Sequence, residues 1–333
     1  MSAKAHASRS HLTEAQLWDA ELDELATPAP LLQSWAWGEV QVRSGWHVER
    51  LRLGSSAMAS VLMRRVGPAR EAYVPRGPVP ATGDTVDALV DWARSAKVAR
   101  LTVEPEAPEG FRDVLAERRF KRATPVQPQH TRILTLHPPA EMLPTLQHGR
   151  RYNIRAGGRR GVIVEEGKDA AELARQSAAV ERREMISLPD RRSYDVLLEL
   201  LPWCRTYTAR APDTGEPLAT LLVARHSGRA YSLFAGRTGA HPELKANDLA
   251  WWAAISAAAE GGCRDFDLWG IPPPGAGERH PWHGLGAFKA EFGGDEVAYA
   301  GAWQLALSGP GSRLIALENS ARAHVRALKR NIS

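Results

Sequence analysis

The chain has 333 residues, which is enough for two domains of ordinary size. Its hydrophobic content of 44% and charged content of 24% are those of a globular protein and exclude a chain without a packed core. The formal net charge of +5 and the pI of about 9.4 favour an anionic partner: nucleic acid, phosphate or a membrane surface. A solvated basic surface without a partner is an equally weighted alternative.

The cysteines and the apolar segments exclude several classes of protein. Cys204 and Cys263 are the two cysteines, and they give neither a disulfide framework nor a cluster of metal ligands. No apolar run approaches the roughly 18 residues that span a bilayer. The first ten residues lack the apolar core of a signal peptide. We therefore expect a cytoplasmic protein.

The N-terminal part predicts a mixed sheet flanked by helices. Thr13 is placed to cap a first helix, and Ser34 to cap a short helix that carries Trp35 and Trp37. The predicted elements are helix 13–25, the hairpin strands 48–53 and 57–65, strand 72–79, helix 85–97, strand 99–103 and helix 110–119.

Glu104 is the acid in this part that we single out. It ends a predicted strand and precedes Pro105, where side chains often face a cleft. An ordinary solvated loop acid is the alternative. The functional interpretation is an acceptor, or base, for an incoming ammonium group.

A strongly basic segment, residues 148–162, follows a strand at 129–136 and a linker marked by Pro138 and Pro139. Arg151, Arg155 and Arg159 lie four residues apart, so a helix would place them on one face. The glycine pair at 157 and 158 costs such a helix about 1 kcal/mol per residue. A solvated charged face is again the alternative.

The next segments repeat the order of the first part and predict a duplicated fold. Two hairpin turns, at Asp213–Gly215 and Ser227–Gly228, join three strands. The predicted elements are helices 169–186 and 196–201, strands 204–210, 217–226 and 229–236, helix 246–261 with Trp251, Trp252 and Ile255 inward, and a basic amphipathic helix 312–330.

One stretch, residues 263–303, combines a buried strand, a rigid loop and a single lysine. The strand Phe266–Trp269 ends at Gly270, and three prolines follow. Lys289 lies between Phe288 and Phe292, and residues 297–303 read as another strand. His280 and His283 flank a Pro-Trp pair; a flexible active-site loop is favoured over a metal site, because no third ligand follows.

These motifs together resemble the FemABX family. The matching segments are Leu-Gln-Ser-Trp-Ala-Trp-Gly-Glu-Val-Gln (32–41), Tyr-Val-Pro-Arg-Gly-Pro-Val (73–79), Arg-Tyr-Asn-Ile-Arg (151–155), Leu-Trp-Gly-Ile (268–271), and Phe-Lys (288–289) with Phe-Gly-Gly (292–294). They occur in the family's order over nearly the whole chain. Members of the family move amino acids from aminoacyl-tRNA onto the stem peptide of peptidoglycan precursors.

The resemblance implies an α/β fold with mixed sheets, built from two GNAT-like acyltransferase domains in tandem. We expect domain 1 to comprise residues 1–137 with 305–333 and to bind the precursor. Domain 2, residues 138–304, would hold the aminoacyl-tRNA and the catalytic lysine. The C-terminal helix would pack on the first domain. Because the sequence has no sustained heptads, we expect no coiled-coil arm.

The resemblance also assigns roles to individual residues. Trp37 and Gln41 match precursor-binding positions; Gln41 stands where a lysine is usual, and Arg43 as its replacement is left open. Glu104 matches an acid of the family. Arg192 and Tyr194 resemble a region that grips the nucleotide or the stem peptide. The residues expected to contact phosphates of the tRNA acceptor end are Arg150, Arg151, Arg155, Arg159 and Arg160.

The reaction we expect is aminolysis of the aminoacyl ester. Lys289 would stabilise the charge that develops on the ester oxygen, with Phe288 beside it and Glu104 as partner of the amine. Tyr231 and Phe234 lie on a strand expected to face a cleft between the domains. No cofactor and no metal are expected, since the ester is already activated. The expected partners of this cytoplasmic monomer are aminoacyl-tRNA and UDP-MurNAc-pentapeptide or its lipid-linked form, with contact at the inner face of the membrane.

Two alternatives stay open from the sequence. The first is a GNAT-like N-acyltransferase with another amine acceptor and coenzyme A or aminoacyl-tRNA as donor. The coenzyme A loop pattern occurs once, at residues 225–230, but in a hairpin where no helix can meet a pyrophosphate, and residues 236–247 lack it. The second is an inactive tRNA- or precursor-binding relative.

Overall fold

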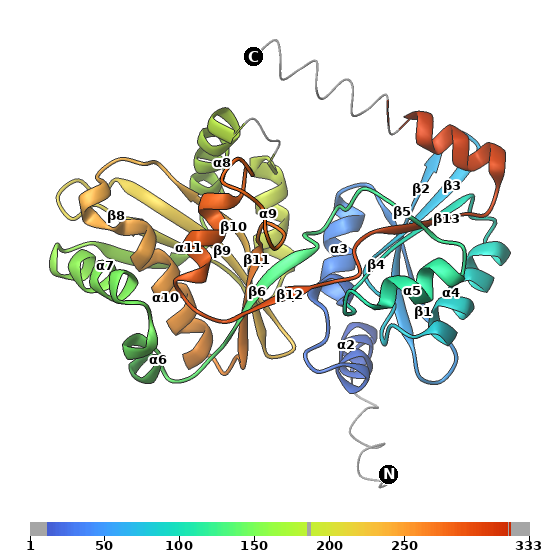
Figure 1. The fold of residues 1–333 in the computed structure, drawn as a ribbon, viewed down its shortest axis with the longest axis horizontal. Coiled ribbons are helices and arrows are strands. Elements are labelled where there is room, and N and C mark those ends of the chain that lie inside the picture. The colour runs from blue at the N-terminus through green and yellow to red at the C-terminus, as the bar shows by residue number, and fades with distance from the viewer. Residues whose placement is uncertain (1–11, 185–187, 319, 321–333) are drawn as a thin grey trace, which may run out of the picture. The chain divides into compact units, whose positions relative to one another are not determined.

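The computed structural model describes residues 12–184, 188–318 and 320, and shows two compact units (Figure 1). Unit 1 is Met1–Gln129 with Tyr299–Ser333, and unit 2 is His130–Ala298. Each has its own mixed sheet flanked by helices, so the expected α/β class is confirmed. The division falls before the strand at 130–135, which joins the sheet of unit 2, rather than at the expected 137/138. Residues 1–11 and the part of the predicted helix 312–330 that follows residue 320 lie outside the described residues.

Unit 1 has a six-stranded sheet in the order β1-β2-β3-β4-β13-β5. Strands β3 and β4 are parallel, while the other neighbours are antiparallel. The elements are α2 (Glu14–Leu25), η1 (Leu31–Gln33), α3 (Trp35–Arg43), β1 (His47–Arg52), β2 (Met58–Val66), β3 (Ala69–Arg76), α4 (Gly83–Ser95), β4 (Arg100–Pro105), α5 (Phe111–Glu117), β5 (Lys121–Arg122) and β13 (Trp303–Ala306).

Both faces of this sheet are covered by helices. On one face, α4 buries Val86, Leu89 and Ala93 against β2, β3 and β4, as its spacing predicts. On the other, α2 and α3 pack against the β1–β2 hairpin. The expected caps are present: Thr13 forms a capping box with Gln16, and the Ser34 side chain accepts from the Trp37 N–H.

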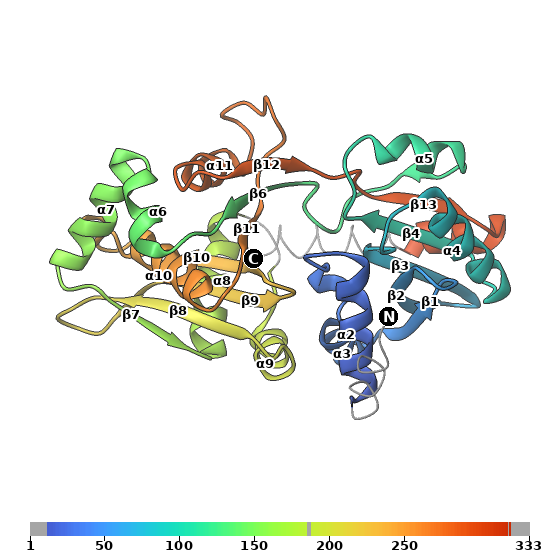
Figure 2. The ribbon, with the colours of Figure 1, turned by 90° about the horizontal axis from the view of Figure 1, so that it is seen from below.

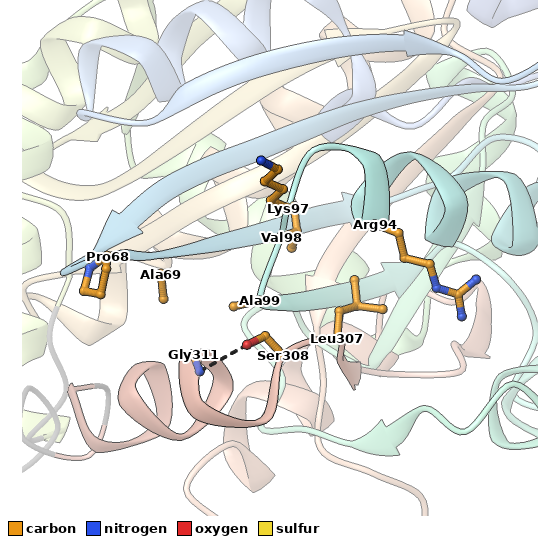
Figure 3. A pocket seen from close by; sticks show the side chains of 9 residues that line it. All are labelled: Pro68, Ala69, Arg94, Lys97, Val98, Ala99, Leu307, Ser308 and Gly311. Atoms are coloured by element: carbon orange, nitrogen blue, oxygen red, sulfur yellow. Dashed lines mark hydrogen bonds between the residues drawn. The ribbon is translucent and has the colours of Figure 1, made fainter.

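The C-terminal segment returns to unit 1, as expected. Leu314 and Ile315, within a helix described over 309–318, pack against Val66, Ala69 and Ala99. A pocket of about 450 Å³ lies where this helix begins (Figure 3). Its cationic side chains, Arg94 and Lys97, extend away from one another, and no candidate site residue lines it.

Unit 2 has a seven-stranded sheet in the order β12-β6-β11-β10-β9-β8-β7. Strands β10 and β11 are parallel, and the other neighbours are antiparallel. The elements are β6 (His130–Thr135), α6 (Pro139–Thr145), α7 (His148–Arg159), β7 (Ile163–Gly167), α8 (Ala170–Glu184), α9 (Arg191–Leu200), β8 (Cys204–Arg210), β9 (Pro217–His226), β10 (Arg229–Arg237), η2 (Pro242–Leu244), α10 (Ala246–Glu260), β11 (Asp265–Gly270), α11 (His283–Ala290) and β12 (Asp295–Ala298).

The central helix of unit 2 is α10, which packs with α6 and α7 on one face of the sheet (Figures 1 and 2). Trp251 and Ile255 are buried there as predicted, and Trp252 is half-buried. Helix α7 packs so closely on α10 that residue 157 has no room for a side chain, because a Cβ there would lie 2.2 Å from Leu249 Cδ1. This packing requires glycine at 157 in spite of its cost to the helix. Helices α8 and α9 cover the opposite face, where α8 contacts β9 and β10.

The two units repeat one topology, which confirms the predicted duplication. In unit 1, three antiparallel strands (β1, β2, β3) lead through α4 into the parallel strand β4, whose other neighbour, β13, is antiparallel. In unit 2, β8, β9 and β10 lead through α10 into β11, whose other neighbour is the antiparallel β6. Strand β11 of unit 2 is therefore the counterpart of β4 in unit 1.

The predicted strand at 297–303 is wrong as a single element. The chain leaves β12 at Ala298 and enters β13, in the other sheet, at Trp303. Between them Gly301 has φ of 79°, a left-handed conformation that ends a strand. The Tyr299 N–H donates to Gln129 O of unit 1. The segment is thus the connection that returns the chain to unit 1.

Candidate functional site

The parallel strands of unit 2 separate, while those of unit 1 stay paired. Strands β3 and β4 are in register over six residue pairs, from Glu71–Arg100 to Arg76–Pro105. Strands β10 and β11 are in register over three, from Arg229–Asp265 to Tyr231–Asp267. Among the described residues no further pairing joins β10 to β11, so the backbone groups beyond Tyr231 and Asp267 are not hydrogen-bonded between these two strands.

Two irregularities lie near the point where this pairing ends. In β10 the register with β9 shifts between Ser232 and Phe234. In β11 two residues, 268 and 269, oppose one residue of β6, because Asp267 pairs with Ile133 and Gly270 with Thr131. Bulges of this kind re-aim side chains and strand ends, and they are frequent beside active sites.

Trp269 has a backbone conformation that bulky residues rarely adopt. Its φ is 64°, in the left-handed region. The Trp269 N–H donates to Asp267 Oδ1 at 2.7 Å. The conformation leaves the carbonyls of Trp269 and Gly270 directed at the side chain of Lys289.

Lys289, on α11, is held at this strand end. Its Nζ donates to Gly270 O at 2.8 Å and to Trp269 O at 3.3 Å, and the side chain is 4% exposed. Burial lowers the pKa of Lys289 to about 7, and the charge of Asp267 opposes that shift. The sequence predicted a lysine in an apolar frame, and the structure adds the backbone groups that fix it.

Aromatic rings frame the lysine and its helix. Phe288 and Phe292 pack on each other at 5.5 Å between ring centroids and on Trp251 of α10. Lys289 Nζ lies 5.9 Å from the Trp251 ring centroid. This packing fixes α11 against α10 and keeps bulk water from the lysine.

Other predicted residues of unit 2 lie along the same strands. The Tyr231 ring meets the edge of Trp269 at 6.2 Å between centroids. Phe234 packs on Tyr194 at 5.6 Å, and the Tyr194 hydroxyl lies 2.5 Å from Ser177 Oγ on α8. Burial raises the pKa of Tyr194 to about 12, so it stays a neutral phenol.

Arg192 and Tyr194 differ in exposure, although they lie two residues apart on α9. On α9 it is exposed, whereas Tyr194 is buried. The structure therefore separates the two residues that the sequence grouped as one gripping region. Tyr194 fixes α8 and α9 to the sheet, and Arg192 is the one available to an anion.

Arg150 is a correction to the predicted tRNA-binding set. It is 2% exposed, pairs with Asp248 of α10, and donates to Glu291 Oε2 at 3.1 Å and Phe288 O at 3.2 Å. Its guanidinium also lies over the Phe288 ring, 4.0 Å from the centroid. Arg150 therefore joins α7, α10 and α11 rather than contacting a phosphate.

The remaining arginines leave a basic surface on α7. Arg155, Arg159 and Arg160 are exposed, and the Arg160 guanidinium donates to Glu243 O. Arg151 is half-buried and donates to the carbonyls that precede α7. The sequence analysis missed Tyr152, which is 51% exposed on the same helix and offers an aromatic ring among the cations.

Glu104 is buried in unit 1 with its oxygens engaged. The Tyr73 hydroxyl donates to Oε2, and the Val126 and Gln127 N–H groups donate to Oε1 at 2.7 and 3.3 Å. Burial raises the pKa of Glu104, opposed by these hydrogen bonds, and the pKa of Tyr73 lies well above its usual value because of burial and Glu104. The carboxylate thus holds residues 126–127 against β4; its role toward an amine stays a prediction.

Trp37 and Gln41 lie one turn apart on α3 of unit 1, and both are half-buried. The exposed Arg43 is two residues beyond Gln41 on the same helix. Arg43 is thus the one cationic side chain of α3, and its role in place of the usual lysine stays a prediction.

An acid that is paired with Arg150 lies in the first turn of α10. Asp248 in its first turn is buried and accepts from Arg150 and, at 2.9 Å, from Asn153 Nδ2. A pyrophosphate bound at a helix N-terminus accepts from its backbone N–H groups, and a carboxylate at that end competes for the same positive potential. The Asp248 carboxylate and its two donors already occupy the first turn of α10.

The described residues form neither a metal-ligand cluster nor a membrane-spanning helix. Over the described ranges, no three His, Cys, Asp or Glu side chains gather as a metal site. His280 accepts from the Trp282 N–H through Nδ1 at 3.1 Å, within the loop before α11. No helix in the described part of the chain is long and apolar enough to cross a membrane.

Known proteins resemble this chain in fold. Residues 145–280 match the family described as "Acetyltransferase (GNAT) domain". The crystal structure of FemX matches with a TM-score of 0.78 and 18% identity, covering 92% of this chain and 98% of that one. A tandem GNAT protein from the clavulanic acid biosynthesis pathway matches with a TM-score of 0.53 and 15% identity, covering 88% and 95%.

A third solved structure extends the likeness. It is the C-terminal domain of a protein named as a lysylphosphatidylglycerol synthetase from Agrobacterium fabrum, with a TM-score of 0.56 and 18% identity, covering 91% of this chain and 96% of that one. No curated protein matches the chain. The resemblance to FemABX proteins read from the sequence is confirmed at the level of the fold: the chain has the tandem GNAT-like fold of FemX.

Proposed function

We propose that the protein is an aminoacyltransferase that moves an amino acid from aminoacyl-tRNA to the stem-peptide amine of a peptidoglycan precursor. The observation that carries the proposal is Lys289: a buried ammonium fixed by two backbone carbonyls where β10 and β11 separate. The whole-chain likeness in fold to FemX supports the donor and acceptor classes.

The lysine suits acyl transfer from an ester. The attacking amine forms a C–N bond to the ester carbon, and the carbonyl oxygen takes the electron pair as an oxyanion. A fixed cation in a site without bulk water stabilises that charge. The C–O bond to the ribose then breaks, and the ribose hydroxyl leaves with the proton that the amine gives up. Lys289 acts here in its protonated form.

The RNA part of the donor is assigned to α7. Arg155 and Arg159 are exposed one turn apart, about 6 Å along the helix axis. This spacing allows each guanidinium to meet a separate phosphate. Contacts of this kind supply affinity and position without reading sequence.

Coenzyme A as donor is the second candidate, because GNAT-type folds also use it. Asp248 argues against it, since its buried carboxylate takes up the first turn of α10. Arg150 is committed to that carboxylate, so its guanidinium is not available to a pyrophosphate there. The experiment therefore has to distinguish aminoacyl-tRNA from a coenzyme A thioester as the donor.

The experiment measures transfer of labelled amino acid from a pool of charged tRNAs to UDP-MurNAc-pentapeptide and to its lipid-linked form. Lys289→Ala is compared with wild type, and Lys121→Ala, an exposed lysine of unit 1, is the matched control. We expect label on one precursor, a loss of about 10²–10³-fold in kcat for Lys289→Ala, and no loss for the control. No transfer, with acetyl-CoA consumed in a parallel amine assay, would establish the second candidate instead.

A further inference from the structure

We propose that Asp267 is a positioning residue for Lys289: its carboxylate fixes the turn at Trp269 whose carbonyls hold the lysine side chain. The proposal rests on the proposed function, in which Lys289 stabilises the oxyanion. It adds a residue that neither the sequence pattern nor the likeness to known folds singles out.

The geometry of the turn carries the argument. Asp267 is buried on β11, and its Oδ1 accepts from the N–H of Trp269, two residues on, at 2.7 Å. Aspartate side chains form this local bond to their own backbone and thereby set a turn. The turn coincides with the bulge in β11, after which Gly270 resumes pairing with Thr131.

The conformation of Trp269 shows that the turn needs support. A bulky residue at φ of 64° persists when its surroundings determine it. The Asp267 carboxylate supports the turn from the N–H side, and Lys289 Nζ supports it from the carbonyl side at 2.8 and 3.3 Å. Asp267 and Lys289 therefore hold the same short piece of backbone from opposite ends.

Strand β6 fixes Asp267 in turn. Thr131, 1% exposed, donates its hydroxyl to the same Oδ1 that accepts from Trp269. The carboxylate is thus oriented by the neighbouring strand before it sets the turn. Thr131 thus orients Asp267, Asp267 fixes the Trp269 backbone, and that backbone holds Lys289.

Asp267 also supplies negative charge near the lysine. It raises the pKa of Lys289 against the lowering by burial. Beside α11, Arg150 of α7 pairs with Asp248 of α10 and with Glu291, and it donates to Phe288 O. Asp267 thus acts on Lys289 in two ways, through the position of the turn and through its own charge. Substitutions of Asp267 that remove one or both distinguish the two effects.

The experiment compares Asp267→Asn, which keeps an oxygen acceptor and removes the charge, with Asp267→Ala, which removes both. Asp295→Asn is the matched control, since Asp295 is an exposed acid on β12 of the same sheet. The first readout is NMR of lysine labelled with ¹³C at Cε; the chain has seven lysines, and Lys289→Met assigns the signal. The second is kcat and KM for transfer as a function of pH.

We expect the Lys289 signal to titrate at lower pH in Asp267→Asn than in wild type, with transfer restored toward wild type as the pH is lowered. In Asp267→Ala we expect kcat to fall by about 10²-fold with KM little changed and with no rescue at low pH, because the lysine is displaced. Asp295→Asn should leave the Lys289 titration where it is in wild type.

An unchanged Lys289 titration in Asp267→Asn, or wild-type kcat in Asp267→Ala, would overturn the proposal. If Asp267→Ala does not fold, the nearly isosteric Asp267→Asn decides alone. If wild type transfers nothing, the proposed function has failed, and the NMR comparison still decides whether Asp267 controls Lys289.

Discussion

Arg229 on β10 and Asp265 on β11 form a largely buried ion pair at the first register position of these parallel strands. Unit 1 has the same pair with the charges exchanged: Glu71 on β3 and Arg100 on β4 hold the first position there. The two units thus share the position of the ion pair, but the acid and the arginine are exchanged between the two strands. Each pair lies where its parallel strands begin to pair; beyond it β3 and β4 stay in register over six residue pairs and β10 and β11 over three.

This exchange predicts that unit 2 also folds when its acid lies on β10 and its arginine on β11, as unit 1 has them on β3 and β4. Arg229→Glu or Asp265→Arg alone brings like charges together and should lower the free energy of unfolding by about 3–5 kcal/mol. Both changes together should recover more than half of that loss. Urea unfolding of the four proteins measures it; equal losses in the double variant and the worse single variant would show that the strands require the existing polarity.

Lys289 should make stability depend on pH in a direction set by burial. Its pKa of about 7 lies below the ordinary 10.5, so between these values the unfolded chain binds more protons than the folded one. Wild type should therefore gain stability relative to Lys289→Met as pH rises from about 7 to 10, by up to about 1.4 kcal/mol per pH unit. Unfolding at several pH values measures the difference; a difference independent of pH would show that Lys289 has an ordinary pKa.

Glu104 should make the stability of the fold depend on pH in the direction opposite to that of Lys289. Its pKa is raised in the folded protein, so from the ordinary 4.5 up to the raised value the folded chain binds more protons than the unfolded one. Wild type should lose stability relative to Glu104→Gln as pH rises through that window and stay level above it. Unfolding from pH 4 to 7 tests this, and a gain by wild type over the window would mean that the hydrogen bonds from Tyr73, Val126 and Gln127 outweigh burial.

The exposed face of α7 should determine RNA affinity through charge. Arg155→Ala and Arg159→Ala should each weaken binding of charged tRNA and reduce the slope of log K against log salt by about 1. Arg122→Ala, an exposed arginine on β5 of unit 1, is the matched control. Fluorescence titration at several salt concentrations measures the slopes, and equal slopes for all four proteins would remove α7 from the RNA interface.

Periodicity and turn chemistry predicted most of the fold. The hairpin turn at Ser227–Gly228 has positive φ at both residues, as its sequence requires, and α4 buries the face that its spacing predicts. The run 297–303 failed because strand-like residues on both sides of Gly301 pair in different sheets. Which sheet a short strand joins depends on distant partners, and local pattern does not contain them.

The candidate site was predictable where one residue type carries the chemistry. Lys289 stood out as one cation among aromatic residues, and the structure places it at the end of β11. Arg150 looked like its basic neighbours, because a run of arginines does not show which one turns inward to Asp248. Asp267 two residues before the turn at Trp269 was the one local signal for the support of Lys289, and an acid within a strand is usually interpreted as solvated.

The most direct measurement is the mass of the precursor after incubation with the protein and charged tRNA. We expect the stem peptide to gain the mass of one or more amino acid residues, with the gain abolished by deacylating the tRNA beforehand and reduced by about 10²–10³-fold in Lys289→Ala. A precursor of unchanged mass, or a gain that survives deacylation of the tRNA, would contradict the account.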